Sequence, residues 1–322
     1  MTSGLLPHAA LVLGLLAFAG PAAAQGMPMP LAPPQAAPAA APVPAPSAAA
    51  ISAADKVPAK QIFGAARGPA DLSSRAIGFY SKGCLSGAVM LPVNGQTWQA
   101  MRLSRNRNWG HPRLVDFIER FAAKVPKVSQ WPGILVGDMA QPRGGPMASG
   151  HASHQIGLDA DIWLTPMPGR EFSAQEREKV SATMIVRPDR LDVDPKVWTG
   201  SHIAVIRAAA QDPEVERVLV NAAIKKALCR DATGDRSWLQ KVRPYWGHDY
   251  HMHVRLSCPK DSPQCRPQDP VVPGEGCTGE ALDWWFSDAN LHPRPPKEPA
   301  KPVPPMMLAD MPPACREVVL AP

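Results

Sequence analysis

Several features that would assign the chain to a common class are absent from its sequence. No Cys-x-x-Cys pair occurs, which argues against a zinc site built from cysteine. The net charge of +6 includes no dense block of Lys and Arg, so we expect no nucleic-acid partner. No internal repeat occurs. Beyond residue 24 no hydrophobic run is long enough for a membrane helix, so we expect no stable membrane span after signal cleavage.

The N-terminus has the apolar centre of a secretory signal peptide but lacks its usual basic start. The stretch HAALVLGLLAFAG is too short for a membrane span, and small residues at 22–24 suit a cleavage site after Ala24. The preceding MTSGLLP contains no Lys or Arg, which leaves a retained N-terminal anchor as the alternative. We expect a signal peptide over residues 1–24.

The 39 prolines are unevenly distributed. Residues 25–58 are rich in Pro and Ala and have nothing to bury, which predicts an extended, partly polyproline linker before a globular domain at 59–322. The last thirty residues are again proline-rich, and the segment from Pro293 to Pro313, with almost no apolar residues at a regular period, is not expected to hold itself in place by packing. A disulfide at Cys315 would instead strap this tail over the domain.

Six cysteines follow the signal segment. An even count in an exported chain favours three disulfides over buried free thiols. The residues alone do not choose among the fifteen possible pairings.

Helices and strands are mixed along the chain. Helical spacing of apolar residues predicts a helix from Pro112 to about Val125, Ser173 with Glu176 forms a capping box, and Asn221 suits an N-cap. Strands are expected in WPGILVGDM, LDADIWL, VERVLV and HMHVRL, with a loop over 141–150. Without regular βαβ alternation, this predicts a single α+β domain with a central, mostly antiparallel sheet flanked by helices and loops.

Five of the nine histidines lie in the two windows GHASHQIGLDADIW and WGHDYHMHVRL. Alternate residues of a strand point to the same face, so His251 and His253 face one way. Asp159 and Asp161 also share a face, so strand geometry does not choose between them.

Imidazoles with one carboxylate suit Zn²⁺ in an open site, where bound water has a pKa near ~7 and becomes a nucleophile. The same set of ligands occurs in non-haem Fe(II) oxygenases, but an oxidising compartment with disulfides favours redox-silent zinc. A closed structural zinc site, or histidines that bind no metal, are the remaining alternatives.

The pattern His-x6-Asp followed by His-x-His resembles the signature shared by lysostaphin-type endopeptidases, D-Ala-D-Ala metallopeptidases and the hedgehog signalling domain. Longer stretches resemble the penicillin-insensitive murein endopeptidases, from about Lys60 to the final cysteine: MRLSRNRNWGHP, GDMAQPRGGPMASGHASHQIGLDADIWL, AAIKKALC and RPYWGHDYHMHVRLSCP. This resemblance implies a periplasmic zinc enzyme that cuts D-alanyl–meso-diaminopimelyl cross-bridges of peptidoglycan and lacks the serine that penicillin acylates.

The resemblance also implies roles for single residues. His154, Asp161 and His253 match the zinc ligands, which favours Asp161 over Asp159. His251 matches the catalytic histidine, as general base or oxyanion stabiliser, and His151 and His248 match further histidines that line the site.

Supporting carboxylates and disulfides follow from the same resemblance. Asp159 is then a supporting carboxylate, and a later aspartate matches Asp189 best, with Asp192 and Asp194 as competitors. The implied disulfides are Cys84–Cys315, Cys229–Cys277 and Cys258–Cys265.

Two other functions remain open for such a zinc site. One is a D,D-carboxypeptidase that trims murein stem peptides with the same chemistry. The other is a non-catalytic, zinc-containing murein-binding domain, although a histidine at position 251 beside the ligands favours catalysis.

Overall fold

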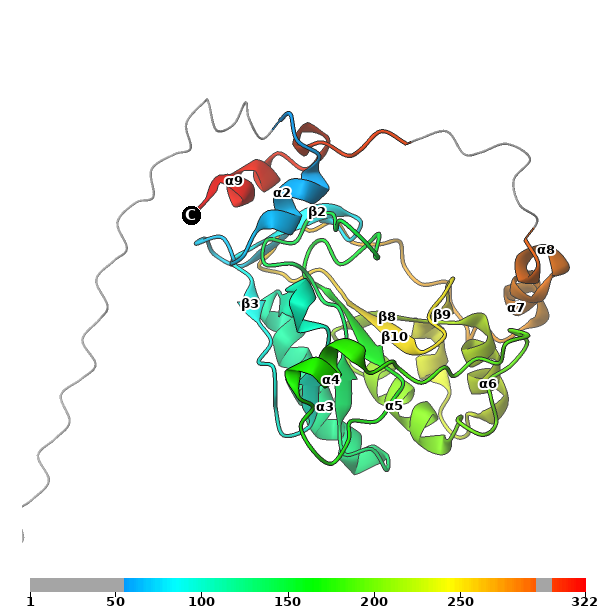
Figure 1. The fold of residues 1–322 in the computed structure, drawn as a ribbon. Helices are drawn as coiled ribbons and strands as arrows, with labels where there is room; N and C mark the ends of the chain where they lie inside the picture. Colours follow the sequence, from blue (N-terminus) through cyan, green and yellow to red (C-terminus); the bar gives the residue numbers. More distant parts are fainter. Residues whose placement is uncertain (1–54, 294–302) are drawn as a thin grey trace, which may run out of the picture. The chain divides into compact units, whose positions relative to one another are not determined.

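A computed structural model describes residues 55–293 and 303–322 (Figure 1). The expected signal peptide over 1–24 lies outside these residues, as does all of the expected linker over 25–58 except its last four residues. In the part of the chain that the structure describes, no helix is long and apolar enough to cross a bilayer.

A six-stranded sheet forms the centre of the domain, in the order β4-β6-β7-β10-β8-β9. The strands are β4 (Trp98–Ala100), β6 (Ile134–Val136), β7 (Asp159–Trp163), β10 (His251–Leu256), β8 (Val215–Val220) and β9 (Val242–Pro244). The pairings from β6 through β8 are antiparallel, whereas the outer strands β4 and β9 pair in parallel.

Two antiparallel pairs of strands complete the sheet structure. They are β1 (Arg75–Phe79) with β2 (Lys82–Ser86) and β3 (Val89–Met90) with β5 (Trp109–Gly110). With the helices below, these strands confirm the expected α+β class with a mostly antiparallel sheet.

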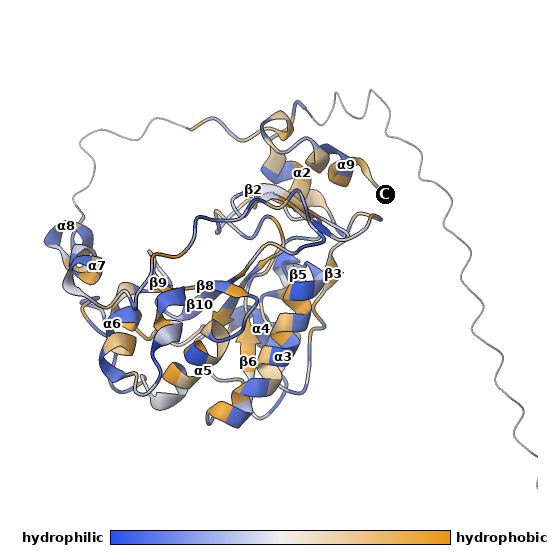
Figure 2. Ribbon diagram, turned by 180° about the vertical axis from the view of Figure 1, so that it is seen from behind, coloured by the Kyte–Doolittle hydropathy of each residue, from blue (hydrophilic) through white to orange (hydrophobic). Residues whose placement is uncertain are grey.

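The predicted helices form where their sequence signals lie. Helix α3 (Pro112–Val128) buries its regularly spaced apolar residues, and Figure 2 shows hydrophobic and hydrophilic residues alternating along it. Helix α4 (Ala174–Lys179) begins with the Ser173 capping box, and α6 (Ala222–Asp231) begins at Asn221, whose side chain accepts from the Ala223 backbone.

Other helices complete the fold. They are α2 (Ala59–Ala65), α5 (Gly200–Ala210), α7 (Gly279–Asp283), α8 (Asp288–Leu291) and α9 (Ala314–Leu320), together with the 3-10 turns η1 (Leu103–Arg105), η2 (Ser237–Lys241), η3 (Trp284–Phe286) and η4 (Leu308–Asp310).

The two faces of the sheet have different composition because side chains alternate along each strand. One face is apolar and joins α3 and α5 in the main core; from β7 and β10 it presents Ala160, Ile162, Met252 and Val254. The opposite face of the same two strands carries Asp159, Asp161, His251, His253 and Arg255. Register between β7 and β10 therefore decides which polar side chains meet.

The C-terminal segment packs more extensively than its composition predicts. Leu308, Met311, Cys315 and Val318 are buried against α2 and β2 in a second apolar cluster. The expectation that the segment from Pro293 to Pro313 would not hold itself in place by packing is therefore wrong at Leu308 and Met311. These four residues recur at helical spacing, and the neighbouring prolines conceal the pattern in the sequence.

Three disulfides staple the domain: Cys84–Cys315, Cys229–Cys277 and Cys258–Cys265. These are the pairs that the family resemblance implies. The first joins β2 to α9 across a sequence separation of 231 residues. The start and the end of the domain are thereby held together.

Candidate metal centre

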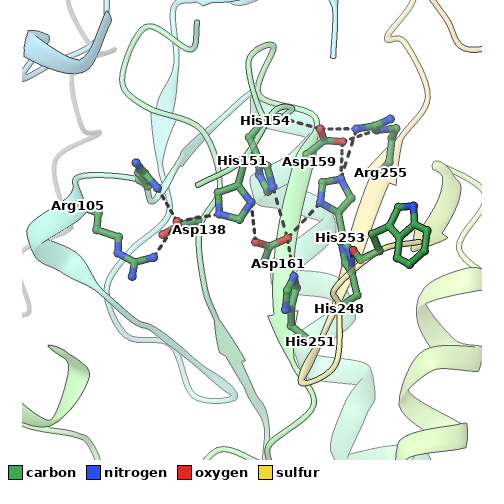
Figure 3. A network of polar contacts seen from close by, with 12 residues as sticks. Arg105, Asp138, His151, His154, Asp159, Asp161, His248, His251, His253 and Arg255 are labelled. Carbon is green, nitrogen blue, oxygen red and sulfur yellow. Dashed lines mark hydrogen bonds and ion pairs between the residues drawn. The ribbon is translucent and has the colours of Figure 1, made fainter. Parts of the chain in front are cut away.

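Strand register brings the histidines and aspartates together (Figure 3). In the antiparallel ladder of β7 and β10, His253 pairs with Asp161, and Arg255 pairs with Asp159. Side chains directly opposite each other share one face of a sheet. The alternating polar residues of the two strands therefore meet in cross-strand pairs.

A tight turn before β7 adds His154 to this group. Gly157 adopts φ +71°, and a Cβ there would lie 2.8 Å from the backbone nitrogen of His111, so only glycine fits. His154 itself has φ 68°, an uncommon left-handed conformation for a residue with a side chain. Its backbone N–H donates to Asp159 Oδ2 at 3.0 Å. Asp159 thus holds the loop that presents His154.

Asp161 is the centre of the cluster. Its oxygens lie 3.1 Å from His253 Nδ1, 3.4 Å from His154 Nε2, 3.5 Å from His151 Nδ1 and 3.6 Å from His251 Nε2. The His248 ring lies 4.7 Å from the His251 ring, measured between centroids. All five histidines singled out in the sequence therefore gather at one place.

The residues present fit a divalent cation. Ligand atoms of His151, His154 and Asp161 lie within 4.8 Å of one another. His154 is fully buried, yet neither of its ring nitrogens has a hydrogen-bond partner among the described residues. Buried polar atoms are almost always paired, so two orphaned nitrogens beside a carboxylate are the pattern expected of metal ligands.

His253 competes with His151 for the third place in such a ligand set. Its ring lies between two carboxylates, with Nε2 3.3 Å from Asp159 and Nδ1 3.1 Å from Asp161. Burial lowers the pKa of His253, but these two charges outweigh burial and raise it to about 9. A cation would therefore have to displace a proton from this ring.

The other histidines of the cluster have different proton affinities. Burial lowers the pKa of His154 and His251, and burial together with the neighbouring histidines lowers that of His248 to about 3. For His151 burial is outweighed by the hydrogen bond to Asp138, which raises its pKa. Burial raises the pKa of Asp161, but the surrounding histidines outweigh burial and hold this pKa well below its usual range.

Two partners of the site were not singled out in the sequence. Asp138 Oδ2 lies 3.0 Å from His151 Nε2 and also accepts from Arg107 and Arg105. Arg255 donates to both oxygens of Asp159, at 2.7 and 2.9 Å. Arg255 could have been found, because it continues the alternation of His251 and His253 along one strand. Asp138 follows a short buried strand, which is a weaker signal.

The later aspartates do not join the cluster in the described part of the chain. Asp189 is exposed and accepts from Arg187 and from the backbone of Leu191. Asp192 accepts from Arg230, and Asp194 accepts from the backbone of Lys196. None of the three forms a hydrogen bond or ion pair with a site histidine in the structure.

Comparison with known proteins decides the family. Residues 76–320 match the family described as penicillin-insensitive murein endopeptidase. The chain is 45% identical over 247 residues to the protein of that name from Yersinia enterocolitica, covering 77% of this chain and 86% of that one. The corresponding protein of Haemophilus influenzae is 44% identical over 215 residues, covering 67% and 74%, and that of Escherichia coli is 42% identical over 237 residues, covering 74% and 86%.

The chain belongs to the penicillin-insensitive murein endopeptidase family. It is therefore a peptidase.

Two cavities flank the centre of this murein endopeptidase. One, of about 460 Å³, is lined by Asp161 and His251 together with Arg102, Arg105 and Tyr250. The other, of about 660 Å³, is lined by His248 and His253 together with Arg217 and Arg243. His151 borders both, so an extended peptide that crosses the centre has room on each side of it.

Proposed function

We propose that the chain is a periplasmic zinc metallo-endopeptidase that hydrolyses the D-alanyl–meso-diaminopimelyl cross-bridges of peptidoglycan and is insensitive to penicillin. The single observation that carries the proposal is the buried Asp161 carboxylate, which has four imidazole rings within 3.1–3.6 Å. Family membership supports murein as the substrate.

His154, Asp161 and His253 would hold the zinc ion. The orphaned His154 nitrogens and the ionised Asp161 carboxylate suit this role. When bound, zinc polarises a scissile carbonyl and lowers the pKa of water. Asp159 keeps the ligands in place, because it binds the His154 backbone, the His253 ring and Arg255.

His251 is the residue best placed to move a proton. Burial keeps its imidazole neutral at pH 7, and its ring borders the first cavity next to Asp161. A neutral imidazole accepts a proton as water adds to the carbonyl and then donates it to the leaving amine.

His151 and His248 would assist in different ways. The hydrogen bond to Asp138 raises the pKa of His151 and so favours its protonated form, whose positive charge would lie near a developing oxyanion. His248 Nδ1 lies 2.7 Å from the Trp246 carbonyl, and this contact fixes the orientation of the ring. The neutral ring lines the second cavity.

In this proposal the protein is exported to the periplasm, where its peptidoglycan substrate lies. Residues 1–24 serve as signal peptide, residues 25–58 as a linker that adds reach, and residues 59–322 as the catalytic domain. The three disulfides support a mature protein outside the reducing cytoplasm.

The cavities on both sides of the centre favour an endopeptidase, which must accommodate peptide on each side of the scissile bond. A D,D-carboxypeptidase removes a terminal residue and needs an open cleft on one side only. The test is to incubate protein lacking residues 1–24 with cross-linked muropeptide dimers and with pentapeptide monomers, and to measure its metal content. We expect dimers to become monomers and one zinc per chain. Release of D-alanine from pentapeptides alone would show a carboxypeptidase, and bound zinc without either product would show a binding domain.

A further inference from the structure

Five arginines line the two cavities, and four of them are already engaged by the protein. Arg105 pairs with Asp138, Arg255 pairs with Asp159, Arg102 donates to backbone carbonyls, and Arg217 donates to the Asp269 carbonyl. The Arg243 side chain forms no hydrogen bond or ion pair within residues 55–293 and 303–322, although Arg243 lies on β9 at the wall of the second cavity.

Strand register connects Arg243 with the metal centre. Asp161 pairs with His253, His253 with Leu219, and Leu219 with Arg243, in one row across four strands. With strands spaced at roughly 4.8 Å, the Arg243 Cα lies about 10 Å from that of His253. An extended peptide covers such a distance in about three residues.

The charge around Arg243 is uncompensated. Arg217 lies close enough that it lowers the pKa of Arg243, although burial is the larger cause. Arg217 Nε is itself buried without a hydrogen-bond partner among the described residues, and its nearest carboxylate oxygen, on Glu216, is 3.8 Å away. A partly buried guanidinium group without an anion, such as that of Arg243, is unfavourable, and a bound carboxylate would relieve this cost.

We infer that Arg243, with Arg217 beside it, is a specificity-determining residue that binds a free carboxylate of the peptidoglycan peptide within about three residues of the scissile bond. The inference rests on the proposed function. A guanidinium group presents paired N–H donors that match the two oxygens of a carboxylate. In the proposed substrate, meso-diaminopimelate and a terminal D-alanine both carry such groups.

The test is binding of uncross-linked tetrapeptide monomers, which an endopeptidase does not cleave, measured by calorimetry on the zinc-loaded protein lacking residues 1–24. Three ligands are compared: the free acid, the peptide amidated at meso-diaminopimelate and the peptide amidated at the terminal D-alanine. The proteins are the parent, Arg243→Gln, Arg243→Lys and the control Arg170→Gln. Arg170 is an exposed residue paired with Glu176 that lines neither cavity, so its replacement removes the same charge elsewhere.

We expect one of the two amidated peptides to bind the parent about 10–100-fold more weakly than the free acid, the range for a charged hydrogen bond. Arg243→Gln should lose this preference, Arg243→Lys should keep part of it, and Arg170→Gln should keep all of it. A parent protein without preference overturns the inference even if Arg243→Gln does not fold. Equal weakening of all three peptides by Arg243→Gln overturns it as well.

Cleavage of dimers by the parent is measured in parallel. A parent that prefers the free acid but does not cleave dimers leaves the carboxylate site standing and refutes the proposed function. A parent that cleaves dimers but binds the free acid and the amidated peptides equally supports the proposed function and refutes the carboxylate site.

Discussion

His253 lies opposite Asp161 in the β7–β10 ladder, and its Nδ1 is 3.1 Å from an Asp161 oxygen while its Nε2 is 3.3 Å from Asp159. The ring is thus held between two buried carboxylates. This arrangement favours a proton on both nitrogens, whereas a metal ligand must be deprotonated at the ligating nitrogen.

Metal binding should therefore release a proton. The pKa of His253 is raised to about 9 without a cation, so at pH 7 the ring is charged and loses its proton when zinc binds. Apparent zinc affinity should increase as the pH rises toward 9 and then level off. Calorimetry at pH 7 in buffers of different ionisation enthalpy measures this release directly. Zinc binding without proton release would show that His253 is neutral or is no ligand.

Asp161→Asn and Asp159→Asn should have opposite effects. Asp161→Asn removes a proposed ligand, so the protein should fold but contain no zinc. Asp159→Asn leaves the buried Arg255 without its partner, which typically costs about 3–5 kcal/mol of unfolding free energy. The folded fraction of this variant should retain most of its zinc.

Metal analysis and urea unfolding of the two variants distinguish these effects. The two residues share one face of one strand, so each variant serves as the control for the other. Loss of zinc in Asp159→Asn with full retention in Asp161→Asn would reverse the assignment.

Replacing His251 separates catalysis from metal binding. His251→Ala should bind zinc at a near-normal level and lose about 10²–10⁴-fold in rate, the usual contribution of general acid–base catalysis. Rates on muropeptide dimers and metal content are measured on the same sample. Loss of zinc would make His251 a ligand, and full activity would shift the proton transfer to His151 or His248.

The three disulfides should differ in the stability that they confer. In the chain-entropy model, a loop of 231 residues closed by Cys84–Cys315 stabilises by about 5 kcal/mol, and one of 7 residues closed by Cys258–Cys265 by about 2 kcal/mol. Cys315→Ser should therefore lower Tm more than Cys265→Ser does. Limited proteolysis should cut before α9 more readily in Cys315→Ser, while the zinc content stays normal. Equal Tm values for the two variants would contradict this order.

The buried carboxylates of the site show what the sequence could and could not predict. Alternation along 251–255 and along 159–161 predicts two strands with polar residues on one face, and both strands are confirmed. Alternation does not give the register between two strands that are about 90 residues apart. Only the observed register pairs Arg255 with Asp159 and places Asp161, opposite His253, at the centre of the histidines.

Contacts between short segments that lie far apart in the chain also could not be predicted from the sequence. The parallel outer strands β4 and β9 have three residues each, too few for a recognisable pattern. The apolar residues of the tail recur at helical spacing, but prolines interrupt the segment, and their partners in α2 lie about 250 residues earlier. Such features depend on tertiary packing, which local propensity does not encode.

The pairing of β2 with α9 also sets the order in which the domain can be completed. Cys84 can form its disulfide only after Cys315 has been synthesised. The apolar residues of α2 likewise become buried only after Leu308 and Val318 are present. Contacts at such long sequence separation form slowly, because the closure of a large loop precedes any gain from the contact. The first segment of the domain to emerge during synthesis is therefore among the last to reach its final packing.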